Sequence, residues 1–293
     1  MARVFCLSFF LLGVLLCSAQ SDYKTYYEKA KGLEKTKDYS GAVVNYTIAI
    51  KTDSTGIGAY YHRGMVKFQI PDFAGAIQDF NKTIELCSNI AVGKESAEMR
   101  AGKFYANSYF YRAEAEFRIF KYRLAIIDYS QAMLKAIDSM GDAYNGRGRA
   151  KKRLADYYHG EYTDAISDFD KGIQLEPHKV FGYYHRGTAE YNAKNYEAAL
   201  KDFTQSVSMD NTDADKYFWL AMAQSKLKSF AIAVSNFSKA IELNPYMDAA
   251  YENRGLAEIE LNRYDEAHAD LTKAAKLKSR NSSTTNSFPL GPE

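Results

Sequence analysis

The sequence predicts an all-α protein in which seven helical hairpins stack into a solenoid, and three recurring residue types carry this prediction. A tyrosine recurs in seven copies, mostly at one constant spacing: Tyr26, Tyr60, Tyr109, Tyr144, Tyr183, Tyr217 and Tyr251. An alanine follows each repeat tyrosine, in most copies at the same offset: Ala42, Ala76, Ala125, Ala165, Ala199, Ala233 and Ala267. Three residues before the alanine comes an aromatic residue: Tyr39, Phe73, Tyr122, Tyr162, Tyr196, Phe230 or Tyr264. Four residues after it comes a large apolar one, here called the repeat aromatic: Tyr46, Phe80, Tyr129, Phe169, Phe203, Phe237 or, in the seventh copy, Leu271. A fixed period of roughly 34 residues indicates stacked repeats rather than one globular core.

Each copy predicts two antiparallel helices, here called helix A and helix B. In the second copy, Ala59–Gln69 is helix A, Pro71 and Asp72 turn the chain, and Phe73–Leu86 is helix B. The apolar residues of helix B recur at the three- and four-residue spacing of a helix that is buried on one side. The repeat alanine has to be small because helices A and B cross closely there.

This pattern resembles the tetratricopeptide repeat, a helix–turn–helix unit of about 34 residues. The small residues four after the repeat tyrosine support the resemblance, and so do the prolines that follow two B helices: Gly64, Gly148, Gly187, Gly255, Pro177 and Pro245. The resemblance implies a right-handed superhelical solenoid over residues 23–281, with the A helices lining a concave groove that binds proteins. The seven units would cover about 23–56, 57–90, 106–139, 141–179, 180–213, 214–247 and 248–281.

The period is interrupted twice. An insertion falls around residues 88–105, and five extra residues fall near Ala155 to His159. In a solenoid such insertions form loops or helix extensions on one face, either as neutral length changes or as contacts for a partner. The Ser-, Thr- and Asn-rich tail, residues 282–293, is predicted to be disordered.

The segment 1–19 predicts a secretory signal peptide. Arg3 precedes an apolar run from Val4 to Leu16, and small residues end at Ala19. Lipid attachment at Cys17 is the alternative, but the bulky Leu16 favours cleavage after Ala19. The sequence therefore predicts an exported protein of the periplasm or the extracellular space, with no membrane span once the signal is removed.

Charge and residue chemistry exclude several function classes. Loss of Arg3 with the signal lowers the formal net charge from +2 by one unit, which gives no field for nucleic acid or an anionic membrane. Cys87 would be the one cysteine of the mature chain, so no internal disulfide is expected. No metal-binding, phosphate-binding or nucleophile motif is present, so we expect neither an enzyme nor a cofactor.

The predicted partner-binding groove combines aromatic and basic residues on the A helices. Five aromatic residues directly follow a repeat tyrosine: Tyr27, Tyr61, Phe110, Tyr184 and Phe218. Four cations lie further along the third and fourth A helices: Arg118, Arg149, Lys152 and Arg153. Aromatic residues and arginine are enriched at protein interfaces, and this composition predicts an acidic partner segment with apolar or aromatic anchors. The alternative is that the rings pack against the neighbouring A helix and that nearby acids balance the cations.

A second pairing recurs inside the copies. In five of them an arginine stands three residues after the repeat tyrosine and an aspartate stands directly before the repeat aromatic. The pairs are Arg63 and Asp79, Arg112 and Asp128, Arg147 and Asp168, Arg186 and Asp202, and Arg254 and Asp270. The other two copies lack the arginine and carry Asn45 or Asn236 in place of the aspartate. We predict salt bridges between helices A and B of one copy, although duplicated units would inherit both residues even without contact.

These features predict an exported scaffold that binds another protein in its groove. The alternative is a structural subunit of a cell-envelope or secretion complex, held through the convex face and the insertions. A carbohydrate binder is a third class, for which the sequence shows no polar cluster.

Overall fold

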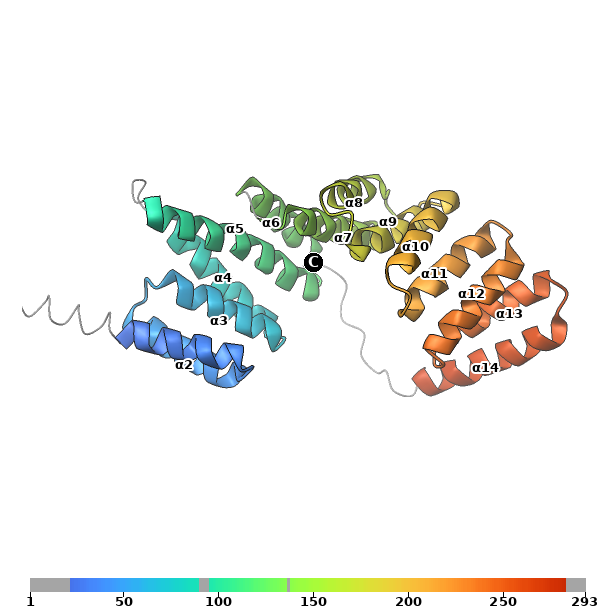
Figure 1. Ribbon diagram of the computed structural model, residues 1–293, viewed down its shortest axis with the longest axis horizontal. Coiled ribbons are helices and arrows are strands. Elements are labelled where there is room, and N and C mark those ends of the chain that lie inside the picture. Colours follow the sequence, from blue (N-terminus) through green and yellow to red (C-terminus); the bar gives the residue numbers. More distant parts are fainter. Residues whose placement is uncertain (1–21, 90–94, 136–137, 283–293) are drawn as a thin grey trace, which may run out of the picture. The chain divides into compact units, whose positions relative to one another are not determined.

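The computed structural model describes residues 22–89, 95–135 and 138–282, and every regular element within them is a helix. The predicted signal peptide, with Cys17, and most of the predicted tail lie outside the described residues. The chain divides into two compact units, with the boundary between Ser139 and Met140. Figure 1 shows the helices of both units, and each unit is considered by itself.

The N-terminal unit contains three helical hairpins. A helix over residues 22–35 packs on α2, α3 pairs with α4, and α5 pairs with α6. The bounds are α2 Tyr39–Thr52, α3 Ile57–Gln69, α4 Phe73–Ser88, α5 Glu95–Arg118 and α6 Tyr122–Leu134. The helices of the second copy agree with the prediction to within two residues at each end.

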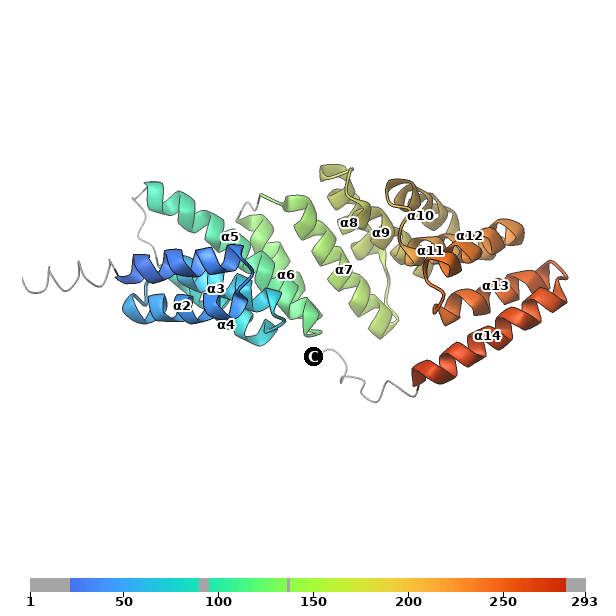
Figure 2. The same ribbon diagram turned by 60° about the horizontal axis from the view of Figure 1, so that its bottom comes forward.

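The C-terminal unit contains four hairpins, formed by α7 with α8, α9 with α10, α11 with α12 and α13 with α14 (Figures 1 and 2). The A helices are α7 Met140–Tyr158, α9 Val180–Asn192, α11 Ala214–Lys226 and α13 Asp248–Glu260. The B helices are α8 Thr163–Leu175, α10 Tyr196–Met209, α12 Phe230–Leu243 and α14 Tyr264–Ser282. Contacts between successive A helices, from α7 through α9 and α11 to α13, form one continuous face of this unit, here called the A-helix face.

The recurring residues form the core of every hairpin. All seven repeat alanines are buried, and each of the six aromatic residues that follow them has no exposed surface. The glycines of the pattern allow this packing, since a Cβ atom added at Gly64 or Gly187 would come within 2.9 Å or 2.8 Å of the ring of Phe80 or Phe203. Within each unit, hairpins stacked around small and aromatic core residues are the predicted solenoid architecture.

Both irregular segments contribute extra helix. The helix α5 is 24 residues long, so much of the first insertion forms additional N-terminal turns of a helix A. The helix α7 has 19 residues where α9, α11 and α13 have 13, because the five extra residues continue it to Tyr158. At the other end of the chain, α14 runs to Ser282, one residue into the predicted tail.

Most turns between helices A and B place a residue with a side chain in the left-handed backbone region. Its φ is between 51° and 67° in six hairpins, at Lys37, Phe120, His159, Lys194, Lys228 and Asn262. At Lys194 the turn is closed by two hydrogen bonds, from the Lys194 N–H to the Tyr191 carbonyl and from the Asn195 N–H to the Glu190 carbonyl. This ending stops helix A and reverses the chain within a few residues.

Candidate functional site

The five arginine–aspartate pairs all meet in the structure. In each pair the arginine Nε and Nη2 atoms donate to the two carboxylate oxygens of the aspartate at 2.5–2.9 Å. The guanidinium carbon also lies 5.1–5.9 Å from the ring centre of the repeat tyrosine. Bidentate, charge-assisted bonds in a half-buried setting fix the register of helix A on helix B.

Four of these arginines also join neighbouring copies, which the sequence did not predict. The Nη1 atom of Arg63 donates to Thr47 of the preceding B helix at 2.9 Å, and Nη1 of Arg186 donates to Asp170 at 2.6 Å. Arg112 and Arg254 reach Asn81 and Ser238 in the same way. A single guanidinium therefore links its own helix B with the helix B before it.

A third side chain, four residues after the arginine, sets the charge around each aspartate. Lys67 lies 2.9 Å from Asp79, and Lys151 lies 2.8 Å from Asp168. In the third copy this residue is Glu116, whose pKa is raised to about 8 by burial and by the negative charge of Asp128. One repeated position thus carries either a second cation or a second acid.

The aromatic residues predicted for the groove are used largely in packing. Tyr61 is only 8% exposed, and its ring lies 4.8 Å from that of Phe104 on the extended part of α5. Tyr27 stacks on Tyr23 at 5.6 Å, Phe110 packs on Tyr129 at 5.7 Å, and Phe218 packs on Phe237 at 5.9 Å. These rings stabilise contacts between helices and leave little surface for a partner.

The basic residues predicted on α7 come together in the C-terminal unit. The pKa of His185 on α9 is lowered by burial and by the positive charges of Arg149, Lys152 and Arg153. The Arg149 guanidinium lies 5.4 Å from the Phe181 ring centre. Lys152 forms an ion pair with Asp156 at 2.9 Å, and Arg153 is exposed without an ion-pair partner in the described part of the chain. Arg149, Lys152 and Arg153 are called the basic cluster below. Arg118 is also exposed, at the end of α5 in the N-terminal unit.

The positive charges of the basic cluster act on the imidazole of His185. Burial, followed by the positive charges of Arg149, Lys152 and Arg153, lowers the pKa of His185 to about 3. The imidazole is therefore neutral at physiological pH and adds no charge of its own. Beside it, burial and then Asp215 and Asp213 raise the pKa of Tyr184 to about 12. The three cations of α7 therefore lie beside His185 of α9, and Asp213 and Asp215 lie at the start of α11 beside Tyr184.

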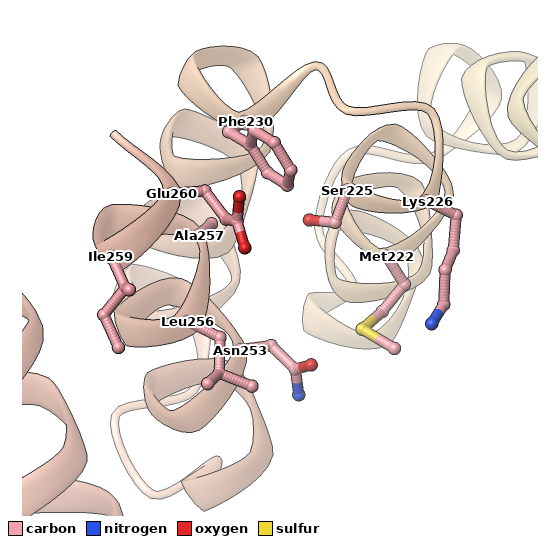
Figure 3. A pocket seen from close by; sticks show the side chains of 9 residues that line it. All are labelled: Met222, Ser225, Lys226, Phe230, Asn253, Leu256, Ala257, Ile259 and Glu260. Atoms are coloured by element: carbon pink, nitrogen blue, oxygen red, sulfur yellow. The ribbon is translucent and has the colours of Figure 1, made fainter. Parts of the chain in front are cut away.

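A pocket that the sequence did not predict lies between α11 and α13. Its volume is about 320 Å³, and it is lined by Met222, Ser225, Lys226, Phe230, Asn253, Leu256, Ala257, Ile259 and Glu260. Figure 3 shows the Ser225 hydroxyl and the Glu260 carboxylate directed toward each other across the space. Phe230 and Ala257 stand at recurring aromatic and small positions, whereas Ser225, Leu256 and Ile259 stand at positions that vary among the copies, so the recurring pattern does not mark the pocket.

The described residues show no arrangement suited to metal chemistry. No group of three or more histidine, cysteine or acidic side chains among them could hold a metal ion. Burial raises the pKa of Cys87 to about 11, so this thiol is protonated at neutral pH. None of the described helices has both the length and the apolar character that a membrane span requires.

Helical hairpins with this repeated core define a tetratricopeptide-repeat solenoid. Residues 154–214 and 220–282 match the family model described as tetratricopeptide repeat, and the helical hairpins of the described residues have the fold of such a solenoid. No curated protein matched the chain in a sequence search.

Solved structures with the same fold share little sequence with this chain. A tetratricopeptide repeat protein from Parabacteroides merdae is 17% identical with a TM-score of 0.62, and the match covers 91% of this chain and all of that one. The C-terminal part of a repeat protein from Cytophaga hutchinsonii is 18% identical with a TM-score of 0.63, over 88% of this chain and 97% of that one. YrrB, described as a tetratricopeptide-repeat protein with an unusual peptide-binding site, is 19% identical with a TM-score of 0.52, over 65% of this chain and 97% of its own.

Proposed function

We propose that this chain is an interaction scaffold that binds an extended, acidic segment of another protein on the A-helix face of its C-terminal unit. The observation that carries the proposal is the basic cluster, which places three cations on one face of α7 beside His185. Three cations on one helix face, with Phe181 beneath Arg149, offer both charge and an apolar surface to a chain lying across α7 and α9. YrrB, which has the same fold, has a peptide-binding site according to its description.

The partial burial of Arg149 and Lys152 supports a binding role over a purely solvated one. The Lys152 side chain is 12% exposed, and Arg149 is half-buried. Charges in such a setting are screened by salt less than fully exposed charges are, so they attract a carboxylate more strongly. Arg153, which is exposed, would add to the rate of encounter.

The test replaces the three cations and measures the binding of a defined probe. The probe is a fluorescent peptide library in which each member carries three consecutive acidic residues and varied apolar neighbours. We expect Arg149→Ser, Lys152→Ser and Arg153→Ser together to weaken the best binders at least 10-fold in fluorescence anisotropy, and binding to the unchanged protein to fall with added salt. A matched control is Lys239→Ser, Lys273→Ser and Lys276→Ser, which removes the same charge from the B helices α12 and α14.

Two results would overturn the proposal. One is that no acidic peptide binds the unchanged protein above the level of a neutral library. The other is that the α7 variant and the control variant lose affinity equally, since net charge alone would then explain the effect. Circular dichroism of both variants shows whether folding is intact.

Export to the periplasm or the extracellular space is part of this proposal and rests on residues 1–19. We expect cleavage after Ala19 when the full chain is expressed in its own host, and N-terminal sequencing with intact mass measures it. A mature chain that begins with a lipidated Cys17 contradicts the proposal.

One observation favours the alternative role as a structural subunit of an envelope or secretion complex. Leu124, Ile127 and Leu134 on α6 are 47%, 56% and 75% exposed, and their spacing of three and seven residues places them on one helix face. An exposed apolar stripe on a helix B could contact a permanent partner. Purification from the native envelope separates the roles, because a subunit elutes in a large, salt-stable complex and a peptide-binding scaffold does not.

A further inference from the structure

The pocket between α11 and α13 is an apolar site on the A-helix face of the C-terminal unit. Met222, Phe230, Leu256 and Ile259 supply apolar surface, and the buried Ala257 lies beneath them. Leu256 is 50% exposed and Ile259 is 38% exposed, so both offer apolar surface to an occupant of the pocket. A volume of about 320 Å³ lies at the lower end of the range for ligand sites and suits one large side chain.

The polar atoms of the pocket select among large side chains. The Ser225 Oγ atom is buried and forms no hydrogen bond within the described part of the chain. The Glu260 carboxylate stands opposite it at the exposed rim (Figure 3). A buried hydroxyl without a partner is unfavourable, so an occupant that brings a hydrogen-bonding group to this end is preferred over a purely apolar one.

We propose that this pocket binds a tyrosine side chain of the same acidic segment that the basic cluster recognises. The ring would pack against Phe230 and the Met222 thioether, which favours contact with aromatic edges. The phenolic oxygen would accept a hydrogen bond from Ser225 and donate one to Glu260. A tyrosine combines a large apolar ring with a polar tip, which is the pattern that the lining presents.

The distance between the two sites sets the spacing in the partner. The basic cluster lies between α7 and α9 and the pocket lies between α11 and α13, so two helix steps separate their centres. Packed helices lie about 8–10 Å apart, which gives roughly 16–20 Å across the A-helix face. At about 3.3 Å per residue, an extended chain covers this distance in five or six residues. The expected partner segment therefore has its acidic residues about five or six positions from a tyrosine.

This inference rests on the proposed function, and the experiment separates the two. The probes are peptides with three acidic residues, a Gly/Ser spacer and a tyrosine, made in both orientations. The spacer is short, middle or long, and the middle spacer matches the distance expected between the two sites. Matched peptides carry phenylalanine, lysine or alanine in place of the tyrosine. Affinity is measured by anisotropy with the unchanged chain, with Ser225→Ala, with Leu256→Trp to fill the pocket, and with Ile232→Trp as a similarly exposed control on α12.

The tyrosine peptide with the middle spacer should bind at least 5-fold more tightly than its alanine version and more tightly than the lysine version. Ser225→Ala should lower affinity for the tyrosine peptide about 5-fold and leave the phenylalanine peptide unchanged, because one net hydrogen bond is lost. Leu256→Trp should abolish the gain from tyrosine, whereas Ile232→Trp should not.

The tyrosine inference is overturned if all middle-spacer peptides bind equally, if Ser225→Ala affects tyrosine and phenylalanine peptides alike, or if lysine is preferred. The proposed function survives those results as long as the substitutions in the basic cluster still weaken acidic peptides. If no acidic peptide binds at all, both fail.

Discussion

Asp202 offers the sharpest test of how the copies are held together. Its residue surface is 3% exposed, and its carboxylate accepts two hydrogen bonds from Arg186 at 2.8 Å and 2.7 Å. Hydrogen bonds to charged groups contribute about 1.5–3 kcal/mol each, so Asp202→Ala could cost up to roughly twice that amount. The Arg186 side chain is 22% exposed and keeps Asp170, so water and that acid offset part of the loss. We therefore expect destabilisation of about 2–3 kcal/mol.

The sixth copy supplies a matched replacement for the whole site. There Leu220 stands in place of the arginine, and Asn236 donates to Gln224 at 2.9 Å. The triple variant Arg186→Leu, Asp202→Asn and Glu190→Gln gives the fifth copy the residues of the sixth. Its free energy of unfolding should be within about 1 kcal/mol of that of the unchanged protein, because no buried charge is left unpaired. As a control, Asp170→Ala should cost less than about 0.5 kcal/mol, since that carboxylate is 56% exposed.

Urea unfolding followed by circular dichroism measures the overall change in the free energy of unfolding. Hydrogen exchange in α9 and α10 measures the local change, which is needed because repeats can open one at a time. The reasoning is wrong if Asp202→Ala costs no more than Asp170→Ala, or if the triple variant is as unstable as the single substitution.

Glu116 and Lys194 give two further predictions. Burial and then the negative charge of Asp128 raise the folded-state pKa of Glu116 to about 8, above its ordinary 4.5. Between these two pH values the folded chain holds a proton that the unfolded chain has lost. The free energy of unfolding therefore falls as pH rises from about 4.5 to 8. Glu116→Gln should remove this slope from hydrogen exchange in α5 and α6 and stabilise the protein at pH 8 by about 1 kcal/mol or more, and an unchanged slope would contradict it. Lys194 has a φ of 67°, so Lys194→Gly should stabilise the protein by about 0.5–1 kcal/mol in urea unfolding. Asn262→Gly, at a φ of 59°, should change stability less because asparagine tolerates this region, and equal effects would show that backbone strain is not the cause.

The helices and the core could be predicted because the same residues recur in seven copies. A single copy would leave the assignment of Phe73 or Ala76 ambiguous, but repetition at one spacing shows which positions are always apolar and always small. The arginine–aspartate pairs could also be predicted from the sequence, since the two residues change together in the sixth copy. The third bond of Arg63, Arg112, Arg186 and Arg254 could not be, because its acceptor varies among Thr47, Asn81, Asp170 and Ser238.

The role of the aromatic residues depended on packing between copies, which the pattern does not show. Tyr61 is buried partly because α5 begins with extra turns that bring Phe104 against it. The sequence marked this insertion by its length alone, and length does not tell whether inserted residues form a loop or a helix. The pocket beside Leu256 and Ile259 was missed because it needs side chains from two A helices at a separation that only the folded chain defines.

On the A helices, the positions that recur stabilise the hairpins, and the positions that vary are available for the proposed recognition of a partner. The repeat tyrosine and the arginine three residues after it hold helix A to two B helices, so they recur and are unavailable to a partner. The residues five and nine positions after that tyrosine follow a different rule. Five positions after it stand Lys31, Met65, Glu114, Arg149, Thr188, Met222 and Leu256. Nine positions after it stand Lys35, Gln69, Arg118, Arg153, Asn192, Lys226 and Glu260, most of them exposed. Packing does not fix exposed positions, so these residues are free to change from basic at α7 to apolar and acidic at α13, and such variation is what the proposed recognition of one particular chain requires.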